Sequence, residues 1–245
     1  MQVRVIHNML QTNSTIICQP IDNFLNIAQV TIDNALNNPS VLDSLSQYGY
    51  TRDRIQYGKT LYENALTAQR WQKTVHSDQI RATATLNQAW EISQRSYRQL
   101  VKAARITFKY DLSVITRLNL NSRGKRSLAI QLLQAQQFYT NLLNSPELIE
   151  ALKPYGVTSA KLEVAQTEME AVQAANLAQA KEKGEAQAAA KARDAAIDIL
   201  RVWLSDFIDI ARIALRQNPQ LLETTVFATL PDQLMSSSLQ VEAVG

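Results

Sequence analysis

Histidine and cysteine, the side chains that bind most transition metals in helical proteins, are scarce in this chain. It contains His7, His76 and a single cysteine, Cys18. A di-iron helical bundle needs Glu-x-x-His motifs on two helices, and zinc–thiolate sites need several cysteines. Neither histidine follows a glutamate at that spacing. We therefore expect no metal site.

Motifs for nucleophilic catalysis and for phosphate binding are also missing. The 6 glycines are scattered and form neither a Gly-x-Ser-x-Gly elbow nor a glycine-rich phosphate loop. With so little histidine, acid–base chemistry would depend on carboxylates. Asp198, Asp206 and Asp209 recur near arginines at the spacing of solvated helical ion pairs. We expect no catalytic residue, no cofactor and no enzymatic activity.

Basic side chains are the remaining candidates for a binding site. Residues 20–126 contain 15 Lys and Arg against 8 Asp and Glu, whereas residues 127–227 contain 9 against 12. A basic surface attracts nucleic acid, but no recognition helix or stacking platform accompanies this one. We favour a solvated face, or one that contacts the acidic segment. The possible interaction face comprises Arg95, Arg98, Lys102, Arg105, Arg123, Lys125 and Arg126.

Apolar and aromatic residues recur at helical spacing in two aligned stripes. We interpret both stripes as core positions, and a ligand pocket between helices is the alternative interpretation. The first stripe comprises Trp90, Ser93, Tyr97, Leu100, Ala104 and Phe108. The second comprises Ile197, Leu200, Leu204, Phe207, Ala211 and Leu215.

The elements that must position these residues occur twice, and the second copy follows the first at a fixed offset of 107. The segment at 38–51 returns at 145–158 with the same proline, tyrosine, glycine and threonine positions, and Ala-Arg-Ile at 104–106 returns at 211–213. A unit of about 100 residues is far longer than a solenoid repeat, so we predict a duplicated domain. The residues assigned to the repeat turns are Pro39, Tyr48, Gly49, Thr51, Pro146, Tyr155, Gly156 and Thr158.

The residue types in these turns predict where helices begin and end. Proline ends the preceding helix, because the residue before it avoids the α conformation. Gly49 and Gly156 can adopt the left-handed conformation that stops a helix. Thr51 and Thr158 then stand where an N-cap is expected. We interpret the tyrosines before the glycines as packing anchors of the turns.

A long helical pattern follows each turn and continues to Phe108 and to Leu215. We predict that each segment folds back into two antiparallel helices near Ser77 and Gly184. Both residues are helix breakers at equivalent positions, and one continuous helix would expose its apolar face.

Composition and length define the predicted architecture. With 6 Gly and 6 Pro in 245 residues, the chain lacks the turn residues of a β protein, so we predict an all-α fold of two tandem homologous helical bundles. The predicted parts are an N-terminal arm (1–19), a basic repeat (20–120), a basic linker (121–126), an acidic repeat (127–227) and a mobile C-terminal tail (228–245).

The function that these features favour is a non-enzymatic interaction or scaffold protein that presents long helical faces to a protein partner or to itself. A membrane-active helical protein that opens its hairpins on a lipid surface is the main alternative. A nucleic-acid-binding accessory protein that uses the basic repeat is a weaker one. We expect no transmembrane segment, because no run of about 18 apolar residues occurs. The N-terminus resembles no secretory signal, so we expect a cytoplasmic protein.

Overall fold

The computed structural model describes residues 19–121 and 127–227, and these ranges are helical and contain no strand. The predicted all-α class is therefore confirmed. The predicted N-terminal arm apart from Gln19, the linker apart from Asn121, and the whole C-terminal tail lie outside the described residues.

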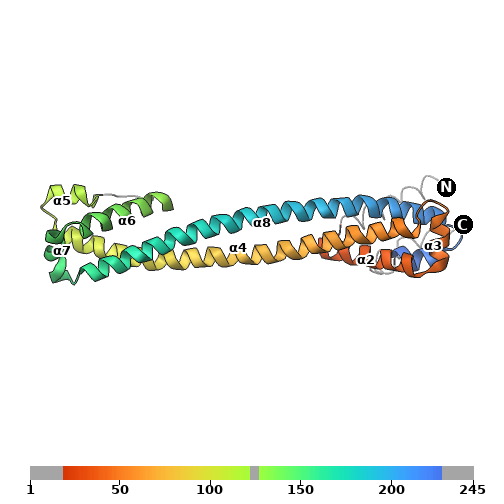
Figure 1. The fold of residues 1–245 in the computed structure, drawn as a ribbon, viewed down its shortest axis with the longest axis horizontal. Coiled ribbons are helices and arrows are strands. Elements are labelled where there is room, and N and C mark those ends of the chain that lie inside the picture. Colours follow the sequence, from red (N-terminus) through yellow and green to blue (C-terminus); the bar gives the residue numbers. More distant parts are fainter. Residues whose placement is uncertain (1–18, 122–126, 228–245) are drawn as a thin grey trace, which may run out of the picture. The chain divides into compact units, whose positions relative to one another are not determined.

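Two long helices dominate the described chain, and shorter helices accompany them (Figure 1). The long helices α4 and α8 begin at equivalent positions of the two repeats and also end at equivalent positions. In chain order the elements are α2 (Ile21–Asn37), α3 (Pro39–Ser46), α4 (Arg52–Thr107), α5 (Leu112–Arg117), α6 (Leu128–Leu143), α7 (Pro146–Leu152), the 3₁₀-helix η1 (Lys153–Tyr155), α8 (Ser159–Ala214), α9 (Pro219–Leu222) and the π-helical η2 (Glu223–Phe227).

Each long helix is continuous over 56 residues, so the predicted reversals near Ser77 and Gly184 are wrong. Both residues are exposed within regular helix. A Cβ atom added to Gly184 would have no neighbour within 4 Å. Such an exposed glycine costs only about 1 kcal/mol relative to alanine, which a long helix can absorb. The apolar faces are covered by other helices instead of by a fold-back of the same helix.

The described residues form two compact units, and neither unit coincides with one repeat. The first unit contains 19–74 and 187–227, and the second contains 75–186. Each repeat therefore contributes to both units, which corrects the expectation of one bundle per repeat. The reason is that α4 and α8 do not reverse. Each helix leaves one unit and enters the other close to Ser77 or Gly184, where we had predicted a bend.

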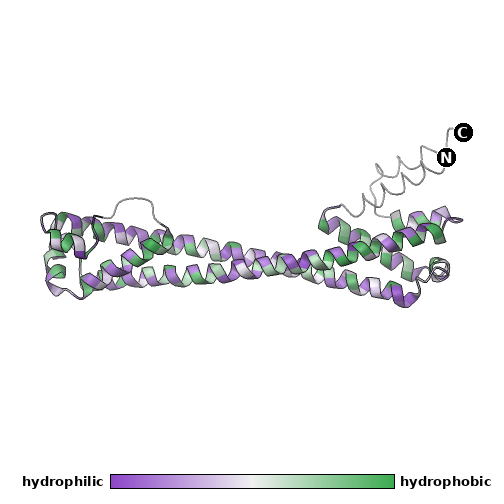
Figure 2. Cartoon of the chain, turned by 90° about the horizontal axis from the view of Figure 1, so that it is seen from above, coloured by the Kyte–Doolittle hydropathy of each residue, from purple (hydrophilic) through white to green (hydrophobic). Residues whose placement is uncertain are grey.

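Each unit has its own hydrophobic core, and Figure 2 shows apolar residues in green alternating with polar ones in purple along the helices. In the first unit, α2, α3 and the first part of α4 pack against the last part of α8. In the second unit, α6, α7 and the first part of α8 pack against the last part of α4. Many buried positions correspond at the offset of 107, including Leu25 and Leu132, Val41 and Leu148, Leu45 and Leu152, Ile55 and Leu162, and Ala211 and Ala104.

The turns before the long helices follow the sequence prediction in their backbone. Gly49 and Gly156 have φ values of 82° and 70°, in the left-handed region that favours glycine. The hydroxyl of Thr158 accepts a hydrogen bond from the Lys161 amide at 3.3 Å, as an N-cap does. At Thr51 it is the backbone carbonyl that accepts, from the Ile55 amide at 3.0 Å. Pro39 and Pro146 are the first residues of α3 and α7.

The interpretation of the two turn tyrosines as packing anchors is wrong. Tyr48 lies in a turn and Tyr155 in η1, and their exposed fractions are 48% and 53%. In the first unit the anchoring ring belongs to Tyr50, which is buried and meets Trp203 and Phe207 edge-on at 6.1 and 5.4 Å between ring centroids.

Candidate functional site

Three of the predicted basic residues gather around one cavity in the second unit. Arg98, Lys102 and Arg105 lie at i, i+4 and i+7 on α4, so they share one face of that helix. Arg95 is exposed on the same helix but does not line the cavity. The other predicted basic residues, Arg123, Lys125 and Arg126, lie outside the described residues.

The cavity has a volume of about 460 Å³ and lies between α4, α6 and α8. Its apolar lining is buried, whereas the three cations that line it are exposed. The apolar lining consists of Val101, Leu132, Ala135 and Met169. The cavity thus combines a buried apolar part with an exposed basic part.

Aromatic and amide side chains complete the lining. Trp90 and Tyr97, which we had interpreted as core residues, are half-buried and face the cavity. The ring of Tyr97 is held edge-on by Phe138 and Tyr139, at centroid distances of 5.5 and 6.1 Å. The remaining polar lining residues are Ser93, Gln94, Asn119, Gln131 and Gln134.

One of the cations has a fixed orientation. The Nε–H of Arg105 donates a hydrogen bond to the carbonyl of Leu120 at 2.9 Å. Leu120 is buried and lies just after α5, next to the lining residue Asn119. The position of the segment after α5 therefore determines where this guanidinium points.

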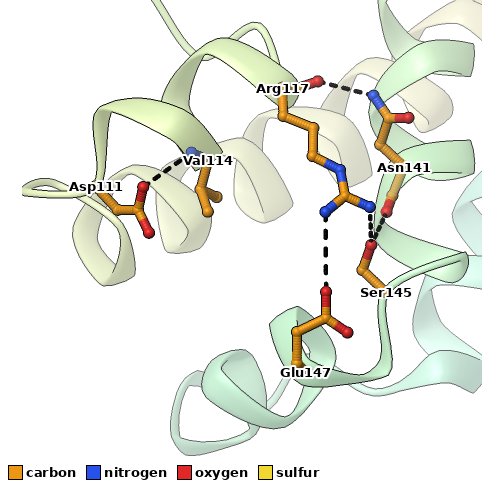
Figure 3. A network of polar contacts seen from close by, with 6 residues as sticks. All are labelled: Asp111, Val114, Arg117, Asn141, Ser145 and Glu147. Carbon is orange, nitrogen blue, oxygen red and sulfur yellow. Dashed lines mark hydrogen bonds and ion pairs between the residues drawn. The ribbon is translucent and has the colours of Figure 1, made fainter.

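A polar network holds the end of α5 against the junction of α6 and α7 (Figure 3). The amide of Asn141 donates to the carbonyl of Arg117 at 2.7 Å, and the Arg117 guanidinium donates to the hydroxyl of Ser145. That hydroxyl donates to the Asn141 carbonyl at 2.8 Å, and Glu147 lies 3.8 Å from the guanidinium. Asp111 caps α5 by accepting from the Val114 amide at 3.0 Å. This network positions the segment that carries Asn119 and Leu120.

A buried phenol lies behind the ring of Tyr97. The hydroxyl of Tyr139 has no hydrogen-bond partner among the described residues. Burial raises the pKa of Tyr139 well above its usual value, and Tyr97 and Glu168 raise it further. The phenol therefore keeps its proton further into the alkaline range than an exposed tyrosine does.

The lining of the cavity combines cationic, amide, aromatic and apolar side chains. No carboxylate lines the cavity within the described part of the chain. The described residues also contain no group of three or more potential metal ligands. Arginine and lysine beside an apolar surface suit an anion that carries an apolar body.

At the cavity the basic face lies beside Gln131, Leu132 and Met169 of the acidic repeat, but no ion pair between described residues joins it to that repeat there. Arg98, Lys102 and Arg105 form no ion pair with a carboxylate in the ranges 19–121 and 127–227. The ion pair between Arg117 and Glu147 does join the two repeats. The basic face is thus directed to the cavity.

Comparison with known proteins gives no relative from which a function could be transferred. No protein-family model matches the chain, and neither the curated proteins nor the solved structures contain a match. None of the helices in the described ranges has a stretch long and apolar enough to cross a bilayer.

Proposed function

We propose that this chain is a non-enzymatic interaction protein that binds a protein partner through exposed faces of its long helices. The observation that supports this role is a recurrence of exposed apolar residues at equivalent positions of α4 and α8. Ile92 and Ile199 are 44% and 54% exposed, and Ile106 and Ile213 are 46% and 54% exposed. A single exposed apolar residue is ordinary on a protein surface. Exposed isoleucines that recur at equivalent positions of both long helices are not explained by packing of the core, and they favour a binding surface.

We also propose that the chain arose by duplication of one module, whose copies now pair reciprocally. The amide of Asn34 donates to the carbonyl of Thr224, and the amide of Asn141 donates to the carbonyl of Arg117, both at 2.7 Å. The two donors occupy equivalent positions of the repeats, and so do the two acceptors. A two-fold symmetric pair produces this pattern, because residue i of one copy contacts residue j of the other and the reverse also holds.

Site-specific photocrosslinking in the cells that make the protein tests the interaction role. A photoreactive residue at position 92 or 199 should give a discrete protein adduct. The same residue at Asn87 or Asp194, which are exposed on a different face of the same helices, should not. The double variant Ile92→Glu and Ile199→Glu should lose adducts formed from position 106. Equal crosslinking at all positions, or none at the isoleucines, would contradict the proposal.

The two alternative functions predict different results with the purified protein. A membrane-active protein would sediment with anionic vesicles, and Ile92→Glu would reduce that binding. A nucleic-acid-binding protein would bind nonspecific DNA with an affinity that falls steeply as salt rises. Vesicle or DNA binding that requires these isoleucines or the basic face would replace our proposal with the corresponding alternative.

A further inference from the structure

We propose that the cavity in the second unit is a binding site for a small organic anion, in which a phosphate or carboxylate group is joined to a flat apolar body. This inference goes beyond the proposed protein partner, because it assigns a ligand site to a different part of the molecule. Its support comes from comparing the second unit with the equivalent positions of the first.

The space that is open in the second unit is filled in the first. Phe24, Ile27 and Leu200 are fully buried there. At the offset of 107, their counterparts in the second unit are Gln131, Gln134 and Ser93, which line the cavity. In the first unit Arg201 also covers Phe24, with its guanidinium 5.3 Å from the ring centroid.

Opening this space is costly for a folded protein. Interiors are close-packed, and replacing a large core residue by a smaller or polar one loses burial and leaves a void. Trp90 and Tyr97 stand where the first unit has the smaller Ile197 and Leu204, so their rings fill part of the space and the rest remains as the cavity. A bound ligand that fills the remaining space supplies a compensating gain.

The charges change in the same place. In the first unit Arg212 pairs with Asp209 at 3.4 Å, so the positive charge is compensated. The equivalents in the second unit are Arg105 and Lys102, so the acidic partner has been replaced by a second cation. Arg98 adds a third, where the first unit has Ser205. Clustered like charges repel one another, and an anion placed between them removes that repulsion.

The size and layout of the cavity specify the ligand further. A volume of about 460 Å³ is in the range of small-molecule sites. The buried apolar lining suits the body of the ligand, and Trp90 and Tyr97 offer flat surfaces beside it. The exposed cations suit a phosphate or carboxylate, because a guanidinium donates two parallel hydrogen bonds to such groups.

Isothermal titration of the full chain with four probes tests the proposal. The probes are 1-naphthyl phosphate, 1-naphthoate, the neutral 1-naphthol and inorganic phosphate. We expect 1-naphthyl phosphate, 1-naphthoate or both to bind with one site per chain, and more tightly than 1-naphthol and inorganic phosphate by about tenfold or more. Preference for one aryl anion identifies its acidic group as the one the site accepts. Failure of both aryl anions to bind, or equal binding of 1-naphthol, would overturn the proposal.

Two pairs of variants locate the site. Arg98→Gln should weaken binding of the aryl anion about tenfold or more, whereas Arg95→Gln on the same helix should change it less than twofold. Gln131→Phe restores the residue type of the first unit and should abolish binding, while Gln136→Phe, at an exposed position of α6, should not. Thermal unfolding checks that Gln131→Phe folds. Equal effects of Arg98→Gln and Arg95→Gln would show that the anion binds elsewhere and would reject this cavity.

Discussion

Gly58 lies directly beneath the indole ring of Trp203 in the first unit. A Cβ atom on Gly58 would approach Cη2 of that ring to 2.1 Å and Cζ2 to 2.3 Å. The indole is itself held in place, because it stacks on Phe207 with a centroid distance of 5.3 Å. In the second unit the equivalent residues are Ala165 and Ser96. The second unit thus has a larger residue in place of the glycine and a much smaller one in place of the tryptophan.

This contact predicts that Gly58→Ala destabilises the protein, although alanine is the better helix former. Helix propensity alone would favour alanine by about 1 kcal/mol, but overpacking against a fixed ring costs about 1–3 kcal/mol or more. Gly184→Ala is the matched control, because nothing lies within 4 Å of that position. Thermal unfolding should show a lower midpoint for Gly58→Ala and a higher one for Gly184→Ala. Trp203→Ser should make Gly58→Ala tolerable, and failure of that rescue would contradict the explanation.

The reciprocal hydrogen bonds predict equal losses in the two units. Asn34→Ala and Asn141→Ala should each cost about 1 kcal/mol relative to Asn37→Ala, because each removes one donor to a backbone carbonyl. Asn37 is an exposed asparagine of the same helix as Asn34, so it corrects for helix propensity. Urea denaturation measures these differences. A large cost at only one of the two positions would argue against equivalent roles.

The buried phenol predicts a pH dependence at alkaline pH. Because the pKa of Tyr139 is raised in the folded protein, the folded state holds this proton after the unfolded state has released it. Stability from this group is complete below pH 10, the usual pKa of tyrosine, and falls as pH rises above it. Tyr139→Phe should make that fall shallower. At pH 7 it should leave stability unchanged or higher, since the hydroxyl has no partner among the described residues. A marked loss at pH 7 would contradict this description.

The network at the end of α5 predicts unequal contributions from its members. Ser145 is fully buried and takes part in two hydrogen bonds, whereas the Glu147 carboxylate is mostly exposed. Ser145→Ala should therefore cost about 1–3 kcal/mol, and Glu147→Gln less than about 1 kcal/mol. Hydrogen exchange of the amides near Leu120 reports whether the segment loosens. Equal effects of the two substitutions would show that the surface ion pair matters more than we infer.

Local sequence signals were sufficient for the helical class and for most helix ends. Proline at positions 39 and 146 and glycine at 49 and 156 act within their own turn, so their effect can be predicted without tertiary contacts. Ser77 and Gly184 are equally local breakers, but single exposed residues of this kind do not outweigh packing along a long helix. The predicted bends failed for that reason.

The cavity could not be located from the sequence, because it depends on which faces of α4, α6 and α8 meet. Its basic residues and aromatic residues were both noted, yet they were assigned to different roles. A partial signal was present in the repeat itself. Positions 131 and 134 carry glutamine where the aligned positions 24 and 27 carry apolar residues. The difference points to an opening in the core only when Phe24 and Ile27 are known to be buried, and the sequence alone does not give their burial.

The path of the chain through its two cores has a consequence for synthesis on the ribosome. The second unit is one contiguous stretch, residues 75–186, whereas the first unit joins residues 19–74 to residues 187–227. Domains fold as their sequences emerge, so the middle of the chain can complete its core first. The N-terminal helices must wait for Ile197–Leu215, almost the last described residues to be translated. Among the described residues, the order of folding thus runs outward from residues 75–186, and residues 19–74 are enclosed only after residues 187–227 have followed.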